Sequence, residues 1–255
     1  VEGGLLRARI DKRLRETAGE STTDVAEYAL KFDGARSHAV VSNFGYNGTW
    51  PITIEVIVKP EGRASHGYSS SDYEQTFFGN LYRGGVGLGI DGSAWAFRFY
   101  YSSGSSGYPY EDTARGYTTG RSSRTRTSSY GIQNKWYHVA GVYNVRAAQL
   151  FVDGKLVDTE AGNGLHMIGQ MPFVIGGDPT GTGGVDSMFD GQIRAIRVSK
   201  TIRYNKDFEP PKELTADAAT VLLFPMNEGR GTKLSSKVGR NIVAHVKDAE
   251  WVKLD

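Results

Sequence analysis

The chain has no cysteine among its 255 residues. Disulfide frameworks, thiolate zinc sites and cysteine nucleophiles are therefore excluded, although the absence suits an oxidising and a reducing compartment equally well. An excess of one charge sign is lacking too, because 30 Lys and Arg face 28 Asp and Glu, giving a formal net charge of +2. Such a balance predicts no sequence-independent attraction to nucleic acid or to an anionic membrane.

Long apolar runs are also missing, so no segment approaches the ~20 residues that a membrane-spanning helix needs. Glycine is abundant instead, at 33 residues, together with 14 Tyr and 11 Phe. Because average glycine usage is only about 7%, this composition indicates a chain with many turns. We therefore predict an aromatic-rich globule without a transmembrane segment.

Residues 1–27 differ in composition from the rest of the chain. Leu5, Leu6, Ile10 and Leu14 recur at helical spacing among basic residues, which predicts a short basic helical leader. Such a helix is suited to a membrane surface or to nucleic acid. The simpler interpretation is a solvated leader, or one docked on its neighbours.

From residue 28 onward the hydrophobic period changes to two. In residues 52–59 every even position is Ile or Val, which predicts a strand with one buried face. The pairs Asp91-Gly92 and Asp153-Gly154 predict tight hairpins. Apart from the leader, one weak helical window remains, Asp207–Ala219, and it is interrupted by two prolines. Many short strands separated by turns predict an antiparallel sandwich or barrel.

Seven segments, taken in chain order, carry a resemblance to a known family. They are Ala29–Gly34, Ile52–Pro60, Trp136–Tyr143 with Leu150–Val157, Ile175–Ile193, Arg197–Ser199, Leu222–Thr232 and Ala249–Val252. The Trp136–Val157 region is similar to the central hairpin of laminin-G-like jelly-roll domains, which belong to the concanavalin A-like lectin and glucanase superfamily. The resemblance covers most of residues 28–253.

The resemblance implies an all-β domain over residues 28–255, preceded by the leader 1–27. The expected fold is a two-sheet antiparallel β-sandwich of the concanavalin A-like jelly-roll type, with both termini on one sheet. Members of this superfamily bind glycans or proteins and many hold calcium. The family's usual setting also implies an extracytoplasmic location.

The carboxylates required for glycan cleavage are not found together. Retaining glucanases of the superfamily alternate two glutamates and an aspartate on one strand, which sets the reacting carboxylates about 5–5.5 Å apart. Glu55 is the only acid on its predicted strand. Alginate-type lyases use Gln-x-His where this chain has Gln192-Ile193-Arg194. His138 lies in a strand pattern and is interpreted as a packed or surface residue, so we predict no enzymatic activity.

Asp178, Asp186 and Asp190 are the candidate calcium ligands. They lie in a glycine-rich loop whose backbone carbonyls would add hard oxygen ligands. The alternative is that Asp178 and Asp190 cap turns through hydrogen bonds to the backbone. Two acidic positions that are common in the family are occupied here by Arg36-Ser37 and by Asn144.

A polar insertion spans residues 102–131, where Ser, Thr, Gly, Arg and Tyr fill 26 of 30 positions. Tyrosine gives a large contact area at little entropic cost, and arginine matches carboxylates or sulfates. We therefore predict recognition of an acidic glycan or a protein surface here, with a solvated loop as the alternative. The predicted ligand-binding residues are Tyr108, Tyr110, Tyr117, Tyr130, Arg115, Arg121, Arg124 and Arg126.

Three function classes follow from the sequence. The first is a non-catalytic recognition module for a glycan or a protein, assisted by calcium. The second is a structural or assembly subunit of a larger complex, in which the leader and the Tyr-rich insertion make protein contacts. The third, a glycan-cleaving enzyme, would require a carboxylate pair assembled from distant strands.

Overall fold

A computed structural model describes residues 28–62, 74–91, 94–102, 110–116, 134–144, 146–161, 165–166 and 168–254. The predicted leader, residues 1–27, lies outside them. The described residues contain strands and turns but no helix. The weak helical window at 207–219 is irregular, because Pro210 and Pro211 prevent continuous helical hydrogen bonding. No helix in the described part is long and apolar enough to span a membrane.

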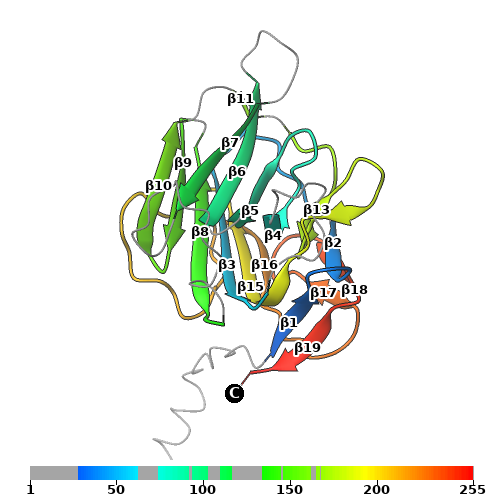
Figure 1. Ribbon diagram of the computed structural model, residues 1–255. Helices are drawn as coiled ribbons and strands as arrows, with labels where there is room; N and C mark the ends of the chain where they lie inside the picture. Colours follow the sequence, from blue (N-terminus) through cyan, green and yellow to red (C-terminus); the bar gives the residue numbers. More distant parts are fainter. Residues whose placement is uncertain are drawn as a thin grey trace, which may run out of the picture.

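Two large antiparallel sheets face each other as a sandwich (Figure 1). The eight-stranded sheet has the order β10-β9-β8-β3-β15-β1-β19, and β16 also pairs with β15. Its strands are β1 (Tyr28–Asp33), β3 (Ile52–Pro60), β8 (Tyr137–Tyr143), β9 (Ala147–Val152), β10 (Lys155–Ala161), β15 (Asp190–Ser199), β16 (Thr220–Phe224) and β19 (Glu250–Lys253). The first and last strands are neighbours, as the resemblance implied.

The second sheet has nine strands in the order β11-β6-β5-β4-β12-β2-β18-β17, and β7 also pairs with β6. Its strands are β2 (His38–Ser42), β4 (Glu74–Gly79), β5 (Val86–Asp91), β6 (Ala94–Ser102), β7 (Tyr110–Gly116), β11 (Leu165–His166), β12 (Val174–Ile175), β17 (Lys233–Ser235) and β18 (Val243–Lys247). A small hairpin joins β13 (Asp178–Pro179) to β14 (Val185–Asp186). The predicted all-β sandwich is confirmed.

The core lies between the inner faces of the sheets. Ile54, Val56 and Val139 are fully buried there, because alternate residues of a strand face the same side. Aromatic rings cross between the sheets, with centroids 4.9 Å apart for Phe99 and Tyr143. This contact joins β6 to β8 across the core.

The predicted turn at Asp153-Gly154 joins β9 to β10. Asp153 has φ 47° and Gly154 has φ 74°, as a type I′ turn requires. A Cβ atom on Gly154 would lie 1.9 Å from the carbonyl oxygen of Phe208. Glycine is therefore needed here both for its conformation and for close packing.

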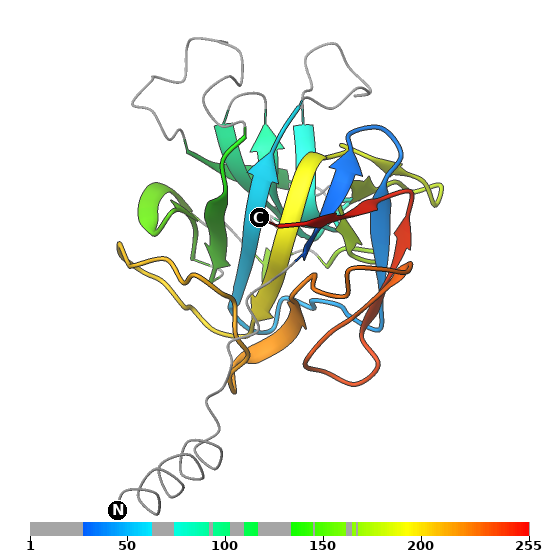
Figure 2. The same cartoon turned by 90° about the horizontal axis from the view of Figure 1, so that it is seen from below.

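Phe208 belongs to the strap, the name we give to residues 200–219 between β15 and β16. The strap crosses the outer face of the eight-stranded sheet and reaches the β9–β10 turn (Figures 1 and 2). The Phe208 N–H donates a hydrogen bond to the Gly154 carbonyl at 2.8 Å. Tyr204 and Phe208 stack with ring centroids 3.5 Å apart.

One end of the sandwich gathers the connections that matter for the site. The β2–β3 loop, residues 43–51, lies beside the β8–β9 turn because Ile52 at the start of β3 pairs with Tyr143 at the end of β8. The β1–β2 turn, residues 34–37, lies at the opposite end, where Asp33 pairs with Asp190.

Candidate binding site

Most of the insertion residues predicted to bind ligand lie outside the described residues. These are Tyr108, Tyr117, Tyr130, Arg121, Arg124 and Arg126. Tyr110 and Arg115 lie on β7, which pairs along β6. Part of residues 102–131 is therefore a strand of the sheet rather than loop, and the ligand-binding role of these side chains stays a prediction.

The three predicted calcium ligands lie in two places. Asp178 and Asp186 are opposite each other in the β13–β14 pair, whereas Asp190 pairs with Asp33 across β15 and β1. Within the described part of the chain, no group of three or more His, Cys, Asp or Glu is placed to hold a metal ion. Asp178, Asp186 and Asp190 therefore do not form a single cage there.

Asp178 is largely buried beside the nine-stranded sheet. Its Oδ1 accepts a hydrogen bond from the Leu81 N–H at 2.8 Å, a contact between residues 97 positions apart rather than a cap on its own turn. Burial raises the pKa of Asp178 to about 7, and the negative charge of Asp186 acts in the same direction. The Leu81 hydrogen bond and the charge of Arg98 oppose this rise.

A second buried carboxylate, Glu55, lies on the outer face of the eight-stranded sheet under the strap. Its two oxygens accept hydrogen bonds from Arg197 Nη2 and Nε, each at 2.7 Å. The Tyr204 hydroxyl donates to Glu55 Oε1 at 2.8 Å. His138 Nε2 lies 3.2 Å from the same oxygen.

The surroundings of Glu55 keep it ionised. Burial alone would raise its pKa, but hydrogen bonds and charge from His138 and Arg197 outweigh burial and lower the pKa to about 2. Glu55 has no exposed surface, and Arg197 and His138 are also buried. The group combines a carboxylate with a histidine, and the Tyr204 hydrogen bond to Glu55 ties the strap to the sheet.

Two adjoining hollows open at the sandwich end formed by the β2–β3 loop, and Trp50 lines both. The smaller has a volume of about 250 Å³ and is lined by Thr49, Trp50, Pro51, Asn144, Arg146 and Ile202. The larger has a volume of about 500 Å³, within the ~300–1,000 Å³ typical of small-ligand sites. Its lining includes Phe44, Tyr46, Asn47, Trp50, Ile168 and Gln170. We call the surface of both hollows the Trp50 surface.

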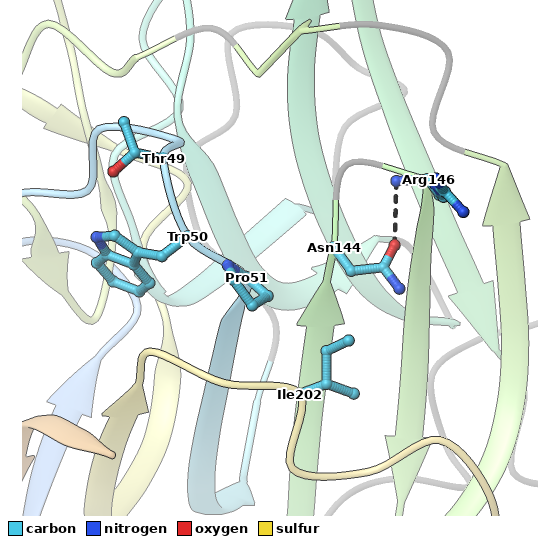
Figure 3. A pocket seen from close by; sticks show the side chains of 6 residues that line it. All are labelled: Thr49, Trp50, Pro51, Asn144, Arg146 and Ile202. Carbon is cyan, nitrogen blue, oxygen red and sulfur yellow. Dashed lines mark hydrogen bonds between the residues drawn. The ribbon is translucent and has the colours of Figure 1, made fainter. Parts of the chain in front are cut away.

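Three separate segments build the smaller hollow. Figure 3 shows Trp50 and Arg146 at its two edges, with Pro51, Asn144 and Ile202 between them. Trp50 comes from the β2–β3 loop, Asn144 and Arg146 from the β8–β9 turn, and Ile202 from the strap. The strap thus contributes directly to the site, and the Glu55 group helps to place it.

Trp50 is held firmly although its side chain is only partly buried. Its ring meets Tyr46 edge to face, with centroids 4.6 Å apart. The Tyr46 hydroxyl donates to the Trp50 carbonyl at 2.8 Å. Phe44 is anchored in turn against Phe173, at 5.1 Å between centroids. These contacts give the surface a preformed aromatic plate, which lowers the entropy cost of binding.

Exposed apolar side chains flank this plate. Of the three large hydrophobic residues that stand out as exposed in the described part of the chain, Ile168 and Ile202 line the two hollows. They are 55% and 41% exposed. Apolar patches that are rimmed by polar groups mark interaction sites.

Sequence reasoning missed the Trp50 surface. Residues 43–51 contain Phe44, Tyr46 and Trp50 among Gly and Asn, the same composition that drew attention to the insertion. The signal was therefore present in the loop, but nothing in the sequence indicates that Asn144, Arg146, Ile202 and residues 168–172 line the same hollows.

Comparisons with known proteins agree with this fold. A laminin G family model, described as Concanavalin A-like lectin/glucanases superfamily, matches residues 33–206. A solved structure of a candidate carbohydrate binding protein from Bacteroides ovatus is 16% identical, with a TM-score of 0.61 over 90% of this chain. This chain spans 60% of that protein's length. No curated protein matches the chain.

Two other solved structures resemble the chain more distantly. Domains LG4-5 of the mouse laminin alpha1 chain are 17% identical over 74% of this chain and 46% of theirs, with a TM-score of 0.47. A pentraxin from Limulus polyphemus is 11% identical over 88% of this chain and 97% of its own, with a TM-score of 0.49.

Proposed function

The chain belongs to the concanavalin A-like lectin/glucanases superfamily, and from this premise we propose that it is a non-catalytic module that binds a glycan through the Trp50 surface. The observation that carries the proposal is the partly buried ring of Trp50, which contacts Tyr46 and lines two open hollows. A sugar ring has an apolar face that packs on an aromatic plate and hydroxyls that pair with amides and arginine.

The polar groups around Trp50 support this assignment. Asn47 Oδ1 accepts hydrogen bonds from the Thr49 N–H and hydroxyl, at 3.1 and 2.7 Å. Asn144 Oδ1 accepts from the N–H groups of Arg146 and Ala147, at 3.0 and 2.8 Å. Because each amide oxygen is committed to folding its own turn, each Nδ2 group is left to donate to a ligand.

A non-catalytic role is part of the proposal. The buried carboxylate that has a histidine neighbour, Glu55, lies beneath the strap rather than in a hollow. Among the residues that the structure describes, no Asp or Glu lines either hollow of the Trp50 surface, whereas glycan cleavage in this superfamily uses paired carboxylates.

The test is a glycan array probed with the wild-type chain and with Trp50→Ala. We expect the variant to lose about tenfold or more in affinity for every glycan that the wild type retains, because the stacking plate is removed. Trp136→Ala is the matched control, since Trp136 is also half-buried but precedes β8 at the opposite end. An unchanged Trp50→Ala profile would refute the assignment of the site.

Calcium assistance is a separate proposal. It is supported by Asp178 and Asp186, the two predicted ligands that lie opposite each other, because calcium takes carboxylate and carbonyl oxygens. Repeating the array with a chelator tests it: binding that disappears and returns with added calcium supports the proposal, and binding that persists contradicts it.

We propose that the chain acts outside the cytoplasm, whichever partner it binds. A protein is the second class of partner that the Trp50 surface suits. Exposed Ile168 and Ile202 favour this alternative, because apolar side chains in such positions are typical of docking surfaces. Size-exclusion chromatography separates the two: a stable oligomer that Ile202→Ser disrupts, with no glycan binding, supports an assembly subunit.

A further inference from the structure

We propose that the ligand of the Trp50 surface is an anionic sugar, whose carboxylate or sulfate pairs with Arg146 in the smaller hollow while an uncharged ring packs on Trp50. This inference rests on the proposed function and names the ligand class. It follows from the charge, hydrogen-bond donors and shapes of the two hollows.

Arg146 is the one charged side chain that lines either hollow in the described part of the chain. It is exposed, and it forms no ion pair with any described residue. Two arginines on or near the strap are already in ion pairs: Arg197 pairs with Glu55, and Arg203 pairs with Asp217 at 2.7 Å. The planar guanidinium of Arg146 is thus available to a carboxylate or sulfate, to which it can donate two parallel hydrogen bonds.

The backbone of Arg146 is hydrogen-bonded to the neighbouring Asn144 side chain. Asn144 Oδ1 accepts hydrogen bonds from the backbone N–H groups of Arg146 and Ala147, so the backbone beneath the guanidinium is held in place. The same two bonds orient the Asn144 amide, leaving its Nδ2 group as a second donor at the same hollow. Two neighbouring donors without a competing acid favour an acceptor-rich, negatively charged group.

The larger hollow has the opposite character. Its described lining residues carry no charged side chain, and its polar groups include amides such as Asn47 and Gln170. Apolar contacts come from Phe44, Trp50 and Ile168. An uncharged sugar ring meets these groups well, whereas a second charge would be left unpaired at a desolvation cost. The pair of hollows therefore fits a glycan in which a charged unit adjoins a neutral one.

The experiment uses ligands that differ only in charge. Isothermal titration measures the affinity of the chain for an oligogalacturonate and for its uncharged methyl ester, and then for a sulfated dextran oligosaccharide and unsulfated dextran. The second pair separates sulfate recognition from carboxylate recognition. The chains compared are wild type, Arg146→Ala, Arg146→Lys and Arg36→Ala. Arg36 is the matched control because it is an exposed arginine in the β1–β2 turn at the opposite end.

We expect Arg146→Ala to weaken binding of at least one charged ligand ten- to a hundredfold, with little change for its neutral partner. Arg146→Lys should recover part of the loss, because the charge returns without the planar fork. Arg36→Ala should bind as the wild type does. Higher ionic strength should weaken the charged ligand selectively.

The contrary outcomes separate this inference from the proposed function. Suppose that neutral glycans bind, that Trp50→Ala abolishes this binding and that Arg146→Ala does not change it. The proposed glycan-binding function is then supported, and the inference of an anionic ligand is wrong. If charged ligands bind and Arg146→Ala does not change their affinity, another part of the protein binds the charged group and the inference is also overturned. If no glycan, charged or neutral, binds the wild-type chain, both proposals fail together.

Discussion

Two buried carboxylates of this protein have pKa values shifted in opposite directions. Glu55 is surrounded by donors and cations that lower its pKa to about 2, whereas burial raises the pKa of Asp178 to about 7. Both are packed against outer faces of the sandwich by connecting segments. Their difference predicts opposite effects of pH on stability.

Replacing Glu55 with Gln should lower the free energy of unfolding by about 3–5 kcal/mol at neutral pH, because Arg197 would be left buried without its counter-charge. The pKa of Glu55 lies below its ordinary 4.5, so its stabilising contribution is present above that pH and is lost as pH falls toward 2. The difference in the free energy of unfolding between wild type and variant should therefore shrink as the pH falls toward 2.

Denaturant unfolding between pH 7 and pH 2 measures this gap. Glu250→Gln, at an exposed position on β19, is the control and should change stability by no more than about 0.5 kcal/mol. A Glu55→Gln variant as stable as the wild type at pH 7 would show that the Glu55 group does not hold the strap.

Asp178→Asn should have the opposite pH dependence. The raised pKa means that folded Asp178 binds more protons than the unfolded chain between pH 4 and 7, so the wild type loses stability as pH rises through this range. The amide cannot ionise, and its oxygen can still accept the Leu81 hydrogen bond. The variant should thus match the wild type near pH 4 and exceed it in melting temperature at pH 8. A difference that is constant with pH would contradict this account.

At the scale of elements, the strap and the β9–β10 hairpin stabilise each other. The Asp153-Gly154 turn was predictable because a type I′ turn requires positive φ at both central residues, which this pair tolerates well. That the strap would pack on this turn was not predictable, since its contacts join residues about 50 positions apart, such as Lys155 Nζ and Asp207 Oδ2 at 3.0 Å. β7 escaped prediction for another reason: its polar sequence, Tyr110–Gly116, has no apolar alternation.

Gly154→Ala should destabilise the protein by about 1 kcal/mol or more, because alanine is strained at φ 74° and its Cβ would meet the Phe208 carbonyl. Gly45→Ala is the matched control, since a Cβ there meets no atom within 4 Å. Chemical unfolding of both variants tests this prediction. Equal midpoints would mean that the turn and the strap are not tightly packed.

At the scale of the whole molecule, the sandwich follows from the alternation of apolar residues, and the sequence was sufficient to predict it. Ile54, Val56 and Leu150 are buried between the sheets as expected. The Trp50 surface lay beyond prediction because it is made by chain segments that meet only after both sheets have formed. Strand order, rather than any local motif, brings the β2–β3 loop to the β8–β9 turn.

The most direct test of the central claim is to fill the larger hollow. Gly45 lines it, and the space beyond its Cα is open. Gly45→Trp should abolish retention on the glycans that the wild-type chain binds while leaving the unfolding midpoint unchanged, and Arg36→Trp at the opposite end should retain them fully. Undiminished retention by a folded Gly45→Trp chain would contradict the account.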